Sequence, residues 1–447
     1  MAPGGLLGTA AVAVLLSLAV HVALHCPIQP LPSPPPPARP PPNNLLQGLE
    51  KLGEGRLSGP EDVYVDAAAG GTLYTATRDG WLQRMQPNGS WEHWRFVGGT
   101  DLLGIAPSAD GSMLVCDAHK GLLKVEDGHV TILASTVEGS TIRFADAVIE
   151  ASDGTVYFSD GSTRFGFGEW FLDYLEARPT GRLLRYDPGT GKASVALDNL
   201  AFANGVALSR DEAFVIVCET AGFRCTRLWL KGDKAGQKET FVDNLPGSPD
   251  NIHLAPDGSF WIALLQLRSP WMDLITRWTL AKRVVASIPA LHEPIKATAK
   301  GAMVAQVSED GEIIRVLDDS QGKVIHFITS VTEFDGHLFL GSLSTNFVGK
   351  LSLAKEAIAT RRVNYIACAR TLTWADFDPA KDEWVKEEAK AAVEERKRKA
   401  ACKKREAARR KKRDATCTVK KSWAEIQVPW ATAARPRKRM TTSAQHG

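Results

Sequence analysis

The sequence predicts an all-β fold, a six-bladed β-propeller, with an N-terminal membrane anchor or signal segment, a helical insertion in blade five and a basic C-terminal tail. Short apolar runs with strand character recur along the middle of the chain, and each follows a turn signal. Their spacing is close to the ~40–45 residues of a propeller blade. The proportions of hydrophobic residues (44%) and charged residues (23%) exclude a wholly disordered or fibrous chain.

The repeating unit is a turn, usually Asp-Gly, followed by a strand. The first apolar residues of six such strands fall at positions 73, 113, 156, 214, 260 and 338, so the steps are 40, 43, 58, 46 and 78 residues. Each unit has room for three or four strands, and six units predict six blades. Two packed β-sandwiches are the alternative, whereas the lack of a short uniform repeat disfavours a solenoid.

The two longest steps contain insertions at residues 161–180 and 265–300, where the strand pattern is interrupted. The second insertion reads as one or two helices, because Trp271, Leu274 and Trp278 fall roughly on one helical face. A helix at this place could cover the mouth of the channel or face a membrane. It could equally pack on the domain without a further role.

Residues 1–26 are predicted to form a signal peptide or a signal-anchor, and residues 27–54 a proline-rich stalk. Leu6–Leu24 is a 19-residue run without charge, about the length of one membrane-spanning helix. Residues 27–42 contain 10 prolines, which favour an extended conformation. Cleaved or retained, this segment would direct the chain into the secretory pathway, as a secreted protein or a single-pass type II membrane protein.

Two features are consistent with a lumenal environment. Asn88-Gly89-Ser90 is an N-glycosylation sequon in a turn between two strand-like runs. Cys218 and Cys225 flank a predicted hairpin turn and could form a disulfide. Unpaired thiols in the core are the alternative, since the pairing depends on a geometry that sequence does not define.

Polar residues recur where the innermost strands of most blades begin. In a propeller these positions form a ring around the central channel. The predicted ring positions are Glu61, Leu103, Ala145/Asp146, Asn204, Asn251 and Thr329, with Asp250 beside Asn251. Carboxylate and amide oxygens are ligands for a hard cation such as Ca²⁺, and no ring of His or Cys suggests zinc. The alternative is that these Asp and Asn residues cap strand ends.

Several motifs together resemble the strictosidine synthase-like family, and within it the adipocyte plasma membrane-associated protein-like group. They span residues 55–353, and the predicted propeller domain is residues 55–355. The motifs include GPEDV (59–63), CDAHKGLL (116–123), YFSDGSTRFGFGEW (157–170), FANGVALS (202–209), LPGSPDNI (245–252) and TEFDGHLFLGSL (332–343). The resemblance implies a six-bladed propeller related to paraoxonases and gluconolactonases. It also implies a signal or type II anchor and a location in the endoplasmic reticulum or vacuole.

The resemblance also implies which family chemistry could transfer. The catalytic Glu of strictosidine synthase corresponds to Thr329, and a hydroxyl cannot replace a carboxylate as the acid and base of that condensation. The esterase and lactonase relatives hold Ca²⁺ through residues matching Glu61, Asn204 and Asn251. One amide ligand is replaced by Ala145, next to Asp146.

The general base of those relatives, a His in blade two, corresponds to Leu103. His119 is near it in sequence, but it follows a different strand and reads as a surface residue. The resemblance therefore implies a partly retained metal site without the known base, and the catalytic residues stay unassigned.

Residues 356–447 form an extension that ends in a basic tail, which we expect to be poorly ordered. Residues 379–447 contain 21 Lys or Arg and 9 Asp or Glu, a net charge of +12, whereas the rest of the chain carries −9. Such a tail is either an arm that binds phosphate groups or a solvated segment without function. The predicted secretory entry favours the second interpretation, so no nucleic-acid partner is expected.

Three functions follow as hypotheses. The first is a lumenal, Ca²⁺-dependent hydrolase of small esters or lactones. The second is a non-catalytic propeller that binds a small molecule or a protein. The third, disfavoured by Thr329, is a condensing enzyme of the strictosidine synthase type.

Overall fold

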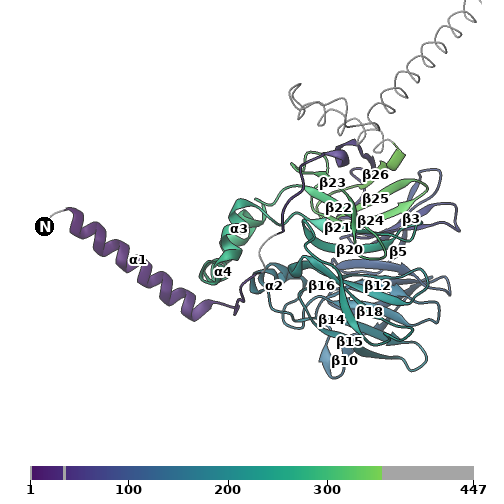
Figure 1. Ribbon diagram of the computed structural model, residues 1–447, viewed down its shortest axis with the longest axis horizontal. Coiled ribbons are helices and arrows are strands. Elements are labelled where there is room, and N and C mark those ends of the chain that lie inside the picture. The colour runs from purple at the N-terminus through teal and green to yellow at the C-terminus, as the bar shows by residue number, and fades with distance from the viewer. Residues whose placement is uncertain (1–2, 34–36, 355–447) are drawn as a thin grey trace, which may run out of the picture. The chain divides into compact units, whose positions relative to one another are not determined.

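The computed structural model describes residues 3–33 and 37–354, with side chains from Ala10 onward. Six four-stranded antiparallel sheets form the blades of a propeller (Figure 1). The prediction of a six-bladed, mainly β fold is confirmed. The predicted extension at residues 356–447, with its basic tail, lies outside the described residues.

Blades one to three follow one another along the chain, and each is a meander of four strands. Blade one is β2 (Val63–Asp66), β3 (Thr72–Ala76), β4 (Trp81–Met85) and β5 (Trp91–Phe96). Blade two is β6 (Leu102–Pro107), β7 (Met113–Asp117), β8 (Gly121–Glu126) and β9 (His129–Ala134). Blade three is β12 (Ala145–Glu150), β13 (Val156–Asp160), β14 (Gly181–Asp187) and β15 (Lys192–Leu200). A small hairpin, β10 (Thr136–Val137) and β11 (Ser140–Thr141), lies between blades two and three in the sequence.

Blades four and five repeat this order, and blade six closes the ring. Blade four is β16 (Ala203–Leu208), β17 (Phe214–Glu219), β18 (Arg224–Trp229) and β19 (Lys238–Val242). Blade five is β20 (Ser248–Leu254), β21 (Phe260–Leu265), β22 (Ala302–Val307) and β23 (Ile313–Asp319). Blade six is β24 (Ile328–Phe334), β25 (His337–Ser342), β26 (Val348–Ser352) and the N-terminal strand β1 (Glu50–Leu52).

The turn signals of the sequence act through a local hydrogen bond. In the turn before β7, the carboxylate of Asp110 accepts a hydrogen bond from the backbone N–H of Ser112 at 3.0 Å, and Gly111 has φ +86°. The turn before β21 repeats this arrangement, with Asp257 accepting from the N–H of Ser259 at 2.9 Å. An Asp followed by a residue that tolerates positive φ therefore marks the start of a second strand.

The hydrophobic core lies between neighbouring blades. One cluster joins blades four and five through Phe214, Phe241 and Phe260, which are all buried. The inner strands touch in the order β2, β6, β12, β16, β20, β24 and back to β2. Where two inner strands approach most closely a side chain has no room, since a Cβ on Gly205 would collide with the carbonyl oxygen of Asp250.

Both predicted insertions carry helices on the same side of the propeller (Figure 1). Between β13 and β14 lie η2 (Phe167–Glu169) and α2 (Trp170–Glu176). Between β21 and β22 lie α3 (Pro270–Arg277), α4 (Thr279–Ala286), η4 (Pro289–Leu291) and α5 (His292–Lys296). Ser269 caps α3 by accepting from the N–H of Met272 at 3.2 Å. The predicted helical insertion in blade five is confirmed.

The N-terminal helix α1 (Pro3–His25) belongs to no blade. Within the described residues, no helix is both long and apolar enough to cross a membrane. Its last turns contact the blade-five helices, because His21 Nε2 lies 3.0 Å from the carbonyl oxygen of Ser287.

Part of the segment predicted to be a stalk packs on the propeller. Ile28 and Leu46 are fully buried, and the carboxylate of Asp318 accepts hydrogen bonds from the backbone N–H groups of Asn43 and Asn44. The stalk prediction relied on proline content, which says nothing of the two buried apolar side chains. Residues 50–52 of this segment are strand β1 itself.

The predicted glycosylation site is exposed, whereas the two cysteines of the predicted disulfide are buried. Asn88 is exposed in the turn between β4 and β5, and its side-chain oxygen accepts from the N–H of Ser90 at 2.9 Å. Cys218 and Cys225 face each other across β17 and β18, but both are buried, free thiols. The disulfide is therefore not formed in this structure, although opposed residues of an antiparallel pair are close enough for one.

Candidate metal site in the central channel

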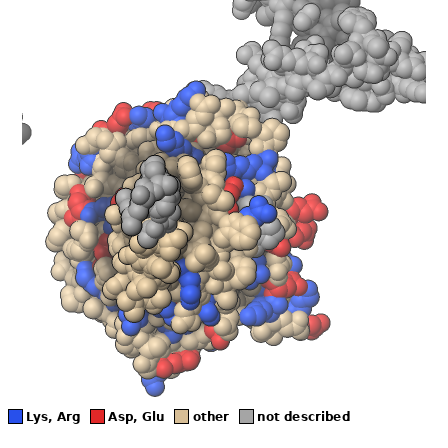
Figure 2. Space-filling view, turned by 90° about the vertical axis from the view of Figure 1, so that its left-hand side faces the viewer, with Lys and Arg blue, Asp and Glu red and all other residues tan. Residues whose placement is uncertain are grey.

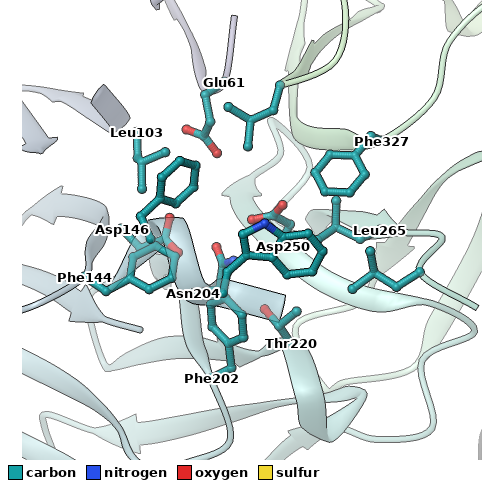
Figure 3. A pocket seen from close by; sticks show the side chains of 14 residues that line it. Glu61, Leu103, Phe144, Asp146, Phe202, Asn204, Thr220, Asp250, Leu265 and Phe327 are labelled. Carbon is teal, nitrogen blue, oxygen red and sulfur yellow. The ribbon is translucent and has the colours of Figure 1, made fainter. Parts of the chain in front are cut away.

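Besides Thr220, four polar residues from four blades line one cavity at the mouth of the channel (Figure 3). They are Glu61, Asp146, Asn204 and Asp250, from blades one, three, four and five. The cavity has a volume of about 40 Å³, enough for an ion or a few water molecules but too small for a substrate. The structure thus brings together four of the five predicted metal ligands.

Irregularities in the inner strands accompany three of these positions. The register of β12 against β13 shifts between Ala145 and Val148, the interval that contains Asp146. Equivalent shifts lie around Asn204 in β16 and around Asp250 in β20. A bulge adds a residue to one strand and redirects a side chain, so the same device can point a polar group into the channel in each blade.

The fifth predicted ligand, Asn251, has a different contact. Its Nδ2 donates a hydrogen bond to Oε1 of Glu61 at 2.8 Å, and it does not line the cavity. Thr329 is also fully buried, and its hydroxyl donates to the carbonyl oxygen of Glu61 at 2.7 Å. Both residues therefore orient Glu61 in this structure.

The acidic groups of the cavity perturb one another. Burial, with added repulsion from Asp62, Asp250 and Asp146, raises the pKa of Glu61 well above its ordinary value. Burial and the charge of Asp146 do the same to the pKa of Asp250. Burial and Asp62 raise the pKa of Asp146 to about 8. These groups cannot all be ionised at neutral pH unless a positive charge joins them.

Two oxygen atoms of the cavity residues have no hydrogen-bond partner among the described residues. They are Oε2 of Glu61 and Oδ1 of Asn204, and both are buried. A buried acceptor without a partner is costly, and a hard cation with oxygen ligands would satisfy both atoms. Among the described residues, no three His, Cys, Asp or Glu side chains form a cation site by themselves. The donor set fits Ca²⁺ only if amide oxygens take part.

The sequence did not reveal the role of Asp62, which follows Glu61. Its Oδ1 accepts from the hydroxyl of Ser330 at 2.6 Å, and its Oδ2 accepts from the backbone N–H of Ile105 at 3.0 Å. The Nε2 of His253 lies 3.4 Å from Oδ1. Asp62 thereby connects blades one, two, five and six, which a sequence pattern cannot show because the partners are distant along the chain.

The apolar wall of the cavity was also not foreseen. Most of its residues come from the loops between blades and from the first insertion. They are Leu103, Phe144, Phe167, Trp170, Phe202, Leu265, Leu267, Phe327 and Leu343. The only sequence signal was the aromatic content of residues 161–180. These side chains keep bulk water away from the carboxyl groups, which is the cause of the burial that raises their pKa values.

His119 does not reach the cavity. Its side chain is 61% exposed, and its Nε2 lies 2.8 Å from Oδ2 of Asp101. No histidine of residues 3–33 and 37–354 lines the cavity, and Leu103 occupies the blade-two position of the ring. This agrees with the interpretation of His119 as a surface residue.

Comparisons with known proteins identify relatives of the whole propeller. A family model described as strictosidine synthase matches residues 146–233, and one described as strictosidine synthase-like, N-terminal, matches residues 41–85. Protein strictosidine synthase-like 4 of Arabidopsis thaliana is 34% identical over 325 residues, which is 70% of this chain and 84% of that protein. The adipocyte plasma membrane-associated protein of Mus musculus is 34% identical over 334 residues, 70% of this chain and 80% of that protein.

A solved structure of a gluconolactonase from Xanthomonas campestris aligns with a TM-score of 0.49 and 16% identity, covering 72% of this chain and 98% of that one. The two relatives found by sequence have about twice this identity to the chain, and most of their length aligns with it. Together with the two family models, they establish that the chain belongs to the strictosidine synthase-like family.

Proposed function

We propose that the protein is a Ca²⁺-dependent hydrolase of small esters or lactones. The observation that supports this most directly is the pair of unpartnered buried oxygens, Glu61 Oε2 and Asn204 Oδ1, in a cavity whose carboxyl groups have raised pKa values. Such a cavity lacks a positive charge. A divalent cation bound by oxygen ligands would supply it.

Each residue of the site has a distinct part in this proposal. Glu61, Asp146, Asn204 and Asp250 would hold the ion, and Asn251 would keep Glu61 in place. Bound Ca²⁺ supplies a Lewis acid that polarises an ester carbonyl. The aromatic wall excludes water and so strengthens every charge interaction inside the cavity.

The test is an assay of the full-length protein with phenyl acetate and an aryl lactone, with Ca²⁺ or with a chelator. We expect turnover that needs Ca²⁺ and falls at least tenfold in Asn204→Ala. Asn346→Ala is the matched control, because Asn346 is exposed and its side chain has no hydrogen bond among the described residues. Turnover that is insensitive to both chelator and Asn204→Ala would rule the proposal out.

A non-catalytic binding propeller is the second candidate. It is favoured by Leu103 in place of the family base and by the absence of histidine from the cavity lining. Stabilisation of the protein by Ca²⁺ without turnover of any ester or lactone would support it. The condensing function has no support from the cavity, since Thr329 lies behind Glu61 and donates to its backbone.

We further propose that the protein resides on the lumenal side of the endomembrane system and contacts the membrane through its N-terminal segment. The relatives named plasma membrane-associated support this, as do the exposed apolar side chains of α1, among them Val14, Leu15 and Leu24. Glycosidase treatment of the expressed protein tests it, because Asn88 would carry a glycan only in the lumen. A mobility unaffected by Asn88→Gln would contradict lumenal glycosylation.

A further inference from the structure

A second, wider hollow adjoins the metal-site cavity. It has a volume of about 700 Å³, within the range of small-molecule pockets. Figure 2 views the face that carries the inserted helices and shows that it is hollowed. The hollow shares four lining residues with the inner cavity, and these form a partition between the two: Phe167, Trp170, Phe327 and Leu343.

We call this hollow the outer basin. Most of the charged residues that line it are basic. Arg78, Lys296, Lys300 and His326 line it, against one acidic residue, Glu293, which pairs with Lys296. Lys300 has no ion pair within the described part of the chain and is exposed. The inner cavity has the opposite character, with three carboxyl groups.

Arg78 is the best-held cation of the basin. Its Nη2 donates to Oδ1 of Asp101 at 2.6 Å, and its guanidinium group stacks over Phe167 at 4.6 Å from the ring centre. Its Nη1 is buried and has no hydrogen-bond partner in the part of the chain that the structure describes. A guanidinium held in a fixed orientation beside a pocket is suited to a carboxylate or phosphate group.

Lys296 approaches the same partition from the other insertion. Its ammonium group lies 5.5 Å from the centre of the Trp170 ring. Cations thus flank the two aromatic residues of the first insertion that line the hollow, Phe167 and Trp170. A ligand that meets this surface would place an apolar part on the rings and an anionic group on Arg78.

We propose that the outer basin recognises small amphipathic anions, an aromatic or similarly flat apolar body with a carboxylate or phosphate group held by Arg78 and assisted by Lys300. This proposal names a substrate class for the proposed function, and its statements about turnover rest on that function. The inner cavity is too small to hold an ester, so the ester carbonyl would lie at the partition while the anionic group occupies the basic side of the basin.

Binding is measured first, independently of catalysis. Quenching of tryptophan fluorescence or calorimetry compares 4-hydroxybenzoate with phenol, which lacks the anionic group, and with phenyl phosphate. We expect 4-hydroxybenzoate or phenyl phosphate to bind at least tenfold more tightly than phenol, with an affinity that decreases with salt. The tighter of the two anions tells carboxylate from phosphate recognition. Equal affinity for phenol and both anions overturns the proposal.

Variants then assign the site. Arg78→Met keeps an apolar stem and should weaken binding of the anion about tenfold or more, and Lys300→Gln should weaken it severalfold. Lys192→Gln is the control, since Lys192 is exposed on the outer strand β15 and does not line the basin. If Arg78→Met does not fold, Lys300→Gln decides. Unchanged anion affinity in the folded variants overturns the proposal.

Turnover separates this inference from the proposed hydrolase. If phenyl acetate and 4-acetoxybenzoate are both cleaved, the anionic ester should have the lower KM, and Arg78→Met should remove that preference. If neither ester is cleaved, but 4-hydroxybenzoate binds and Arg78→Met abolishes that binding, the hydrolase fails and the anion site stands. If both are cleaved with equal KM, the hydrolase stands and the anion site fails.

Discussion

Asn251 Nδ2 lies 2.8 Å from Glu61 Oε1, although 190 residues separate the two in sequence. The contact links blade five to blade one across the channel. It occupies one oxygen of Glu61 and leaves the other, Oε2, buried and without a partner. The geometry thus divides the five predicted ligands into four that line the cavity and one that orients a neighbour.

The first prediction concerns Asn251. In Asn251→Ala the carboxylate of Glu61 loses the one side-chain donor that it has among the described residues, so its orientation is no longer fixed. Partners of metal ligands typically contribute about 10-fold to 100-fold in affinity, and we expect a loss of Ca²⁺ affinity of that order by calorimetry. Asn346→Ala should bind Ca²⁺ like the wild type. An unchanged Ca²⁺ affinity in Asn251→Ala would contradict the orienting role given to Asn251.

The second prediction concerns pH. In the metal-free folded state Asp146 has a pKa of about 8, against 3.8 as its ordinary value, because burial opposes its ionisation. Between these values the folded state binds more protons than the unfolded state, so stability decreases as pH rises. Thermal unfolding in chelator should show Tm decreasing from about pH 5 to pH 8 for this reason.

Adding Ca²⁺ should reverse that trend, because the cation replaces protons on the same carboxyl groups. The gain in Tm from Ca²⁺ should therefore be larger at pH 8 than at pH 5. Asp146→Asn should make the metal-free profile less steep, and the raised pKa values of Glu61 and Asp250 should keep part of the slope. A Tm gain that is equal at both pH values would mean that Ca²⁺ binds elsewhere.

The third prediction concerns the interblade contact of Asp62. The hydroxyl of Ser330 donates to this buried carboxylate at 2.6 Å, and hydrogen bonds to charged groups contribute about 1.5–3 kcal/mol. Ser330→Ala should lower the free energy of unfolding by about that amount in urea. Ser135→Ala, at an exposed serine, should change it by less than about 0.5 kcal/mol. Equal effects of the two would refute the role given to Asp62.

The periodic parts of the fold were predictable, and the contacts between distant segments were not. Asp-Gly turns set the strand starts, and the start of each inner strand set the ring positions of Glu61 and Asn204, because a propeller repeats one local pattern. The sequence could not tell whether Asn251 or its neighbour Asp250 is the ligand, because the spacing between blades fits both positions. The bond from Ser330 to Asp62 and the buried state of Leu46 depend on partners more than 200 residues away, which periodicity does not record.

The last prediction compares two leucines of the predicted stalk that the structure places differently. Proline content places Leu31 and Leu46 in one extended stalk, where neither side chain would contribute to stability. In the structure Leu31 is 37% exposed, whereas Leu46 is 0% exposed and packs with Ile325, Ile328 and Leu351. Leu46→Ala should therefore cost about 2–5 kcal/mol of unfolding free energy, as for other buried leucines.

Leu31→Ala should cost well under about 1 kcal/mol, because its side chain is partly solvated and its backbone bond to Glu176 is kept. Denaturant unfolding of the two variants measures both values on the same chain. Loss in Leu46→Ala alone means that residues 43–52 are part of the propeller, with β1 completing blade six against β26. Similar small losses of unfolding free energy in both variants would mean that this segment is a linker and that the folded domain begins after it.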